Sequence, residues 1–93
     1  MRMDEDDVFM SLKMQLVTCI SEIITQKNWT QTRAARELAI SRSRLCRMLG
    51  GQVDVESEGR MLRCLTSLGR DIHITVGPEH VGVGQILVIK DEI

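Results

Sequence analysis

The sequence predicts a mainly α-helical protein, a bundle of four or five helices followed by a short C-terminal β-hairpin or pair of strands. Apolar residues recur at helical spacing over residues 8–24 and again over 61–68. After Gly69 the period of the apolar residues changes to two, which is typical of a half-buried strand. We therefore assign residues 1–69 to a helical domain and residues 70–93 to a β appendage.

The first helix is expected to begin near Val8 and to run to about Lys27. The acidic residues at positions 4–7 stand where they would favour the positive end of its dipole. Trp29, one of only two aromatic residues, is expected to pack against the bundle.

Hydroxyl side chains mark the starts of the next three helices. Thr30, Ser41 and Ser57 each precede a helical pattern and can accept a hydrogen bond from a backbone N–H of the first turn. The glycines at 50–51 end the third helix, and Gly69 ends the fourth.

Residues 31–50, QTRAARELAISRSRLCRMLG, carry the most informative pattern in the chain. They predict two short amphipathic helices joined by a tight turn. The positions that would hold these helices together are all apolar: Ala34, Ala35, Leu38, Ile40, Leu45 and Met48. This is the helix-turn-helix arrangement, in which the second helix, here called the reading helix, lies in the DNA major groove. A helical hairpin that uses the same packing for another purpose is the alternative.

A helical wheel separates the two faces of the reading helix. The core-facing arc holds Leu45, Met48 and Leu49, and the other side holds Arg42, Ser43, Arg44 and Arg47. The planar fork of arginine can bond guanine O6 and N7 together and pairs equally well with phosphate. A solvated charged face is the alternative, but this helix contains no acid that could pair with the arginines along it.

The stretch WTQTRAARELAISRSRLCRMLGG resembles the XRE group of phage-repressor and Cro-like helix-turn-helix proteins. The run SEGRMLRCLTSLGRDIHITV resembles a subgroup that includes HigA-like antitoxins. Together the resemblance covers residues 29–76. It implies a sequence-specific regulator that binds double-stranded DNA, and within the subgroup the autoregulating antitoxin of a toxin–antitoxin pair. An interaction module that keeps the fold but does not bind DNA is the alternative.

The resemblance also implies roles for individual residues. Gln31 stands in the place of the glutamine that bonds the DNA backbone and braces the reading helix. The residues expected to contact base edges are Arg42, Ser43 and Arg47, and those expected to contact the DNA backbone are Thr30, Gln31 and Arg44. At the turn the family normally has a glycine with positive φ, whereas this chain has Ala39. Left-handed geometry would cost alanine about 1 kcal/mol.

Charge is distributed unevenly along a chain whose net charge is only −1. Residues 31–51 have five arginines and one acid, so they carry +4, whereas residues 1–30 carry −2 and residues 52–93 carry −3. Local charge, not total charge, faces the phosphates. The acidic flanks could attract a basic partner such as a ribonuclease-type toxin, with the segment 1–7 ordering on binding.

The polar residues do not suggest an enzyme, a metal site or a bound cofactor. There is no CxxC pair, and His73 and His80 complete no ligand cluster. No catalytic set, phosphate-binding glycine loop or carboxylate pair is indicated by spacing. With only Phe9 and Trp29 aromatic, there is no stacking platform for single-stranded nucleic acid.

The three cysteines, Cys19, Cys46 and Cys64, each lie in a helical pattern and are expected to be buried thiols. Their odd number and the lack of a secretory signal favour a cytoplasmic protein. No apolar run approaches membrane-spanning length.

The C-terminal residues predict two strands. Residues 71–76 alternate polar and apolar, and residues 85–90 form an apolar run expected to be buried on both sides or in an interface. Two strands alone are marginal in water, so the helical domain, a second copy or another protein must cover them. We therefore expect a homodimer that binds an inverted repeat, with half-sites about 34 Å apart.

Overall fold

The computed structural model describes residues 5–91 of the chain. Its helices are α1 (Glu5–Gln26), α2 (Gln31–Leu38), α3 (Arg42–Leu49) and α4 (Glu58–Ser67), with the short 3-10 helix η1 (Val53–Val55) between α3 and α4. The predicted mainly helical architecture is confirmed. No helix of the described residues is long and apolar enough to cross a membrane.

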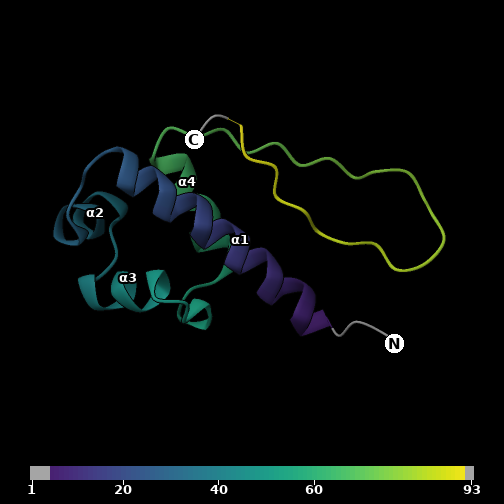
Figure 1. Ribbon diagram of the computed structural model, residues 1–93, viewed down its shortest axis with the longest axis horizontal. Coiled ribbons are helices and arrows are strands. Elements are labelled where there is room, and N and C mark those ends of the chain that lie inside the picture. Colours follow the sequence, from purple (N-terminus) through teal and green to yellow (C-terminus); the bar gives the residue numbers. More distant parts are fainter. Residues whose placement is uncertain (1–4, 92–93) are drawn as a thin grey trace.

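Helix α1 is the longest helix of the helical body. Helix α4 packs along it, and α2, α3 and η1 pack at one side (Figure 1). Each of these elements contributes apolar side chains to one core. The buried residues are Leu16, Val17, Cys19, Ile20, Ile23, Ile24, Ala34, Ala35, Leu38, Leu45, Met48, Val53, Met61, Cys64 and Leu65. Trp29 packs against this core while remaining partly exposed, as the sequence predicts.

All three predicted N-caps are confirmed by their geometry. The hydroxyls of Thr30, Ser41 and Ser57 each accept a hydrogen bond from the backbone N–H three residues later, at 3.1, 3.1 and 3.2 Å. Each such cap stabilises its helix by about 1 kcal/mol. The short helices α2 and α3 therefore begin at positions that their own sequence fixes.

The turn between α2 and α3 has the left-handed geometry of the helix-turn-helix motif although alanine occupies it. Ala39 has φ 57° and ψ 41°, and its N–H bonds the carbonyls of Ala35 and Arg36. Ile40, just after it, packs against the core. The surrounding packing therefore holds alanine in a conformation that glycine adopts without strain.

The predicted C-terminal strands are absent from the described residues. Residues 70–91, here called the arm, leave the helical body as a long loop whose two limbs are separated over most of their length (Figure 1). A strand requires a neighbouring backbone about 4.8 Å away to complete its hydrogen bonds, and neither limb provides this for the other. The prediction was wrong because alternation of apolar residues shows that a segment could form a strand. It does not show that a second strand lies beside it to complete the hydrogen bonds.

The return limb of the arm is attached to α1 by side chains. Gln15 accepts a hydrogen bond from the Val88 N–H at 2.7 Å and donates one to the Ile86 carbonyl at 3.2 Å. Lys90 donates to the Glu22 carboxylate at 2.8 Å, and this bond raises the pKa of Lys90. Gln15 thus stands in for a neighbouring strand at two backbone groups.

Burial of the return limb is much less than predicted. Val88 is partly buried against the core, but Leu87 is 67% exposed and Ile89 is 81% exposed. The expectation that residues 85–90 are buried on both sides is therefore wrong for the single chain.

The cysteines divide into two environments. Cys19 and Cys64 are buried free thiols, and burial raises the pKa of both. Cys46 is exposed, so the expectation of a buried thiol is wrong there. Helix α3 meets the core through Leu45 and Met48, and position 46 faces away from that contact.

Ala39→Gly should increase the free energy of unfolding by up to about 1.5 kcal/mol. Relief of the left-handed strain, about 1–2 kcal/mol, exceeds the added entropy of the unfolded chain, about 0.4–1 kcal/mol. Chemical denaturation measures the change. The control is Ala34→Gly within α2, which should lower the free energy of unfolding by more than about 1 kcal/mol, because it lowers helix propensity and also removes a buried methyl group. Similar losses for the two variants would contradict the strain argument.

Candidate nucleic-acid interface

Helix α3 presents opposite chemistry on its two faces. Leu45 and Met48 are fully buried, which anchors the helix to the body. The side chains of Arg42, Ser43 and Arg47 are exposed. The division of faces predicted from the wheel is therefore confirmed, although contact with bases is not tested by it.

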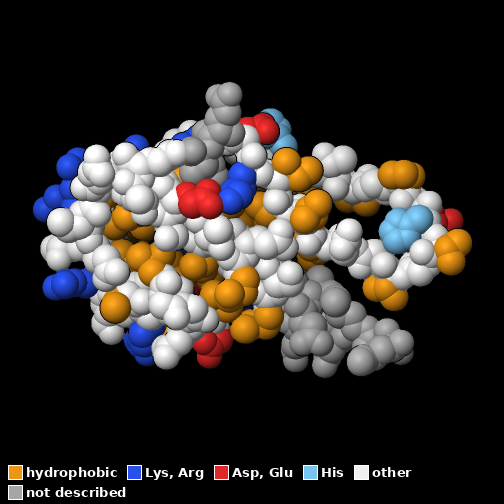
Figure 2. All heavy atoms as spheres, in the orientation of Figure 1, with side chains coloured by type: hydrophobic (Ala, Val, Ile, Leu, Met, Phe, Trp, Pro, Cys, Tyr) orange, Lys and Arg blue, Asp and Glu red, His pale blue; other side chains and the backbone are white. Residues whose placement is uncertain are grey.

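Cationic side chains gather around α2 and α3. Figure 2 shows Lys and Arg side chains at the end of the helical body where Figure 1 places these two helices. Neither α2 nor α3 has an acid in its first turn. The positive ends of both helix dipoles and the arginine side chains therefore contribute potential of the same sign.

The start of α2 lies beside a half-buried aromatic ring. The Thr30 hydroxyl accepts from the Arg33 N–H, which leaves its own O–H able to donate, and Gln31 is exposed at the first position of the helix. The Arg33 guanidinium and the Lys27 ammonium lie 5.0 and 5.2 Å from the centre of the Trp29 ring. Sequence reasoning missed this pair of cations. They lie on either side of Asn28, whose left-handed backbone (φ 56°) is part of the turn between α1 and α2.

Arg44, the remaining predicted backbone contact, is bonded within the protein. Its Nε donates to Glu56 Oε1 at 2.7 Å, and an Nη donates to the Val55 carbonyl. Glu56 is only 6% exposed and also lies 3.8 Å from the Arg60 Nε. The Arg44 side chain remains 48% exposed, so part of its fork still faces solvent.

Glu56 is the residue of this region that sequence reasoning missed. The reading helix contains no acid, and the carboxylate arrives from a segment twelve residues further along the chain. Nothing in the local pattern of Glu56 marks it as buried, because its burial depends on how η1 packs against α3 and α1.

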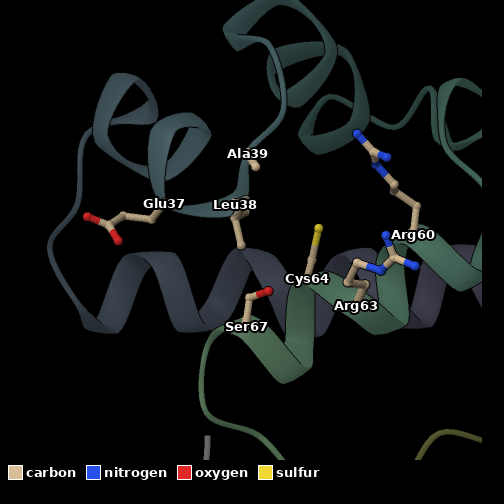
Figure 3. Close-up of a pocket in the computed structure, with 7 residues that line it drawn as sticks. All are labelled: Glu37, Leu38, Ala39, Arg60, Arg63, Cys64 and Ser67. Carbon is tan, nitrogen blue, oxygen red and sulfur yellow. The ribbon is translucent and has the colours of Figure 1, made fainter.

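A shallow hollow of about 150 Å³ lies behind the turn, between the end of α2 and α4 (Figure 3). The residues that line it are Glu37, Leu38, Ala39, Arg60, Arg63, Cys64 and Ser67. It is open to solvent and its lining mixes both charges. Within residues 5–91 no group of three His, Cys, Asp or Glu side chains could hold a metal ion.

The chain belongs to the helix-turn-helix domain family, whose sequence pattern matches residues 2–77. A solved structure, of a protein provisionally described as an XRE-family transcriptional regulator, superposes with a TM-score of 0.85. The match covers 92% of this chain and 99% of that one at 19% identity, and it shows that the two share an XRE-like fold. No curated protein matches the sequence.

Proposed function

We propose that this protein is a sequence-specific regulator of transcription that binds double-stranded DNA with α3 in the major groove. The observation that carries this proposal is the division of α3 into a buried apolar face and an exposed, acid-free face of Arg42, Ser43 and Arg47. Family membership and the regulator named in the structural match support it.

We assign contacts with the DNA bases to the exposed residues of α3. Contacts with phosphates are assigned to residues at the helix starts and at the side of α3. Arg42 and Arg47 can each bond a guanine edge, and Ser43 lies one turn before Arg47 on the same exposed side. Thr30, Gln31 and Arg44 lie at helix starts or on the flank, where phosphate contacts fix the register of a protein on DNA.

The regulator is further proposed to act as a homodimer on an inverted repeat. Among the described residues the large exposed apolar side chains avoid the cationic region entirely: they are Phe9, Met10, Met14, Ile72, Ile74, Val76, Val81, Val83, Ile86, Leu87 and Ile89. Figure 2 shows such side chains along the arm, at the other end of the molecule from the arginines. Pairing of two arms across a two-fold axis would cover them and complete their backbone hydrogen bonds.

An antitoxin role is the finer proposal. It is supported by the subgroup resemblance of residues 57–76 and by the acid excess on both sides of the helix-turn-helix unit. A ribonuclease-type toxin must carry positive charge to hold RNA, so acidic flanks would speed encounter with it. Segment 1–7 was named above as the one to order on binding; its first four residues lie outside the described part of the chain.

Arg42→Ala and Arg47→Ala should each weaken binding to an operator by about 1–3 kcal/mol and relax preference at one base pair, because each removes a bidentate guanine contact. The operator is first selected by the wild-type protein from randomised duplexes. Titrations against operator and random duplex measure the effect, with Arg63→Ala on α4 as the control.

Equal losses on both duplexes for Arg42→Ala and Arg47→Ala would sink the base-reading assignment. If the wild-type protein selects no duplex at all, the alternative of an interaction module that does not bind DNA is the correct one.

Ile74→Asp should weaken the dimer by at least tenfold, because it places a carboxylate on the apolar face of the outgoing limb. Thr75→Asp, the next residue and on the opposite face of an extended chain, is the matched control with the same charge change. Sedimentation equilibrium measures the dimer dissociation constant. Deleting residues 70–93 should give a folded helical domain with weaker self-association, and an unchanged dimer would place the interface on the helices instead.

Co-expression with the product of the neighbouring gene should protect cells from that product, with a complex that co-purifies at low salt and weakens as salt rises. Growth with and without this chain measures the protection. If cells tolerate the product equally well in both cases, or if no complex forms, the antitoxin role fails and a DNA-binding regulator remains.

A further inference from the structure

Glu56 joins the reading helix to α4 from a buried position. It is 6% exposed, and its two carboxylate oxygens face arginines of different helices. Oε1 accepts from the Arg44 Nε of α3 at 2.7 Å, and Oε2 lies 3.8 Å from the Arg60 Nε of α4. Both Arg44 and Arg60 have side chains about half exposed, so each extends from the protein surface to this one buried anion.

Because the Glu56 carboxylate is buried, its charge must be compensated by nearby groups. An ionised carboxylate withdrawn from water is costly unless charge and hydrogen bonds compensate it. Arg44 supplies the shorter contact, so moving its guanidinium away would leave Glu56 with only the longer ion pair to Arg60 at 3.8 Å. The position of the Arg44 guanidinium is therefore set by the body of the protein.

Arg44 is held at its backbone as well. Its N–H donates to the Ser41 hydroxyl at 3.1 Å, which is the cap of α3. Its Nε and one Nη are taken by Glu56 and the Val55 carbonyl. An arginine has five N–H donors, so three remain on a fork whose direction is already fixed.

We propose that Glu56 is a positioning residue for DNA binding. It holds the Arg44 guanidinium in the orientation in which the remaining N–H groups of Arg44 donate hydrogen bonds to one DNA phosphate. This inference rests on the proposed DNA-binding function and assigns a role to a residue that does not itself contact DNA. An arginine fixed before binding loses less rotamer entropy when it meets the phosphate. The same arrangement fixes the first turn of α3, because Arg44 is its third residue.

The opposite role predicts an effect of opposite sign. If Glu56 kept Arg44 away from DNA, removing the carboxylate charge would release a cation toward the phosphates. Binding would then tighten and its dependence on salt would steepen. Under the proposal, Glu56→Gln weakens binding even though the protein becomes more positive.

The test compares Glu56→Gln with Asp54→Asn, which makes the same charge change at an exposed residue of η1. Operator affinity is measured by titration over a range of salt concentrations, after circular dichroism confirms that each full-length variant is folded. We expect Glu56→Gln to bind about tenfold more weakly, with a shallower salt dependence, as for loss of one charge-assisted bond. Asp54→Asn should bind as the wild type does or slightly more tightly.

A double-mutant cycle then separates positioning from general loosening of the fold. In an Arg44→Ala background, Glu56→Gln should change affinity by less than about twofold, because the group that it positions is gone. If the Glu56 variant fails to fold, Arg44→Lys provides an independent test, because residue 44 is half exposed. Lysine keeps the charge but lacks the fork, so this variant should lose most of the affinity that Arg44→Ala loses.

Three results would overturn the inference: tighter binding by Glu56→Gln, losses that simply add in the double variant, or full affinity in Arg44→Lys. Each of these requires a wild-type protein that binds its operator. A wild-type protein that binds no duplex contradicts the proposed function itself, so the two failures are distinguishable.

Discussion

Burial of Leu45 and Met48 is the constraint on which the rest of the molecule depends. Both side chains are fully buried, and each contributes about 1.5–3 kcal/mol through its burial. Because α3 has only eight residues, fixing these two positions fixes the direction of every other side chain on it. The arginines face outward because the leucine and methionine face inward. The surface that we assign to DNA is therefore a consequence of core packing.

The molecule separates its surface by chemistry. Cationic side chains gather on α2 and α3, whereas the large exposed apolar side chains of the described residues lie on the first half of α1 and on the arm. Under the proposed function, this division lets DNA and a second copy of the chain bind to different parts of the surface. Within the helical body, Glu56 couples α3 to α4, so that the reading helix and the helix behind it form one unit.

Much of the fold and half of the candidate site follow from local sequence. The caps at Thr30, Ser41 and Ser57 depend on hydrogen bonds within one turn. The left-handed Ala39 lies at the turn between the two helices of the helix-turn-helix pattern. The exposed position of Arg42 follows from helical periodicity alone. These features could be predicted because they depend on interactions between residues that are close together in the sequence.

What only the tertiary structure decided involves residues that are distant in sequence. The carboxylate that binds Arg44 comes from beyond the reading helix, and the arm forms no strands because its two limbs do not pair with each other. Alternation along the arm determined which residues share a face. Strand formation needs hydrogen bonds to another segment, and periodicity within one segment carries no information about where that partner lies.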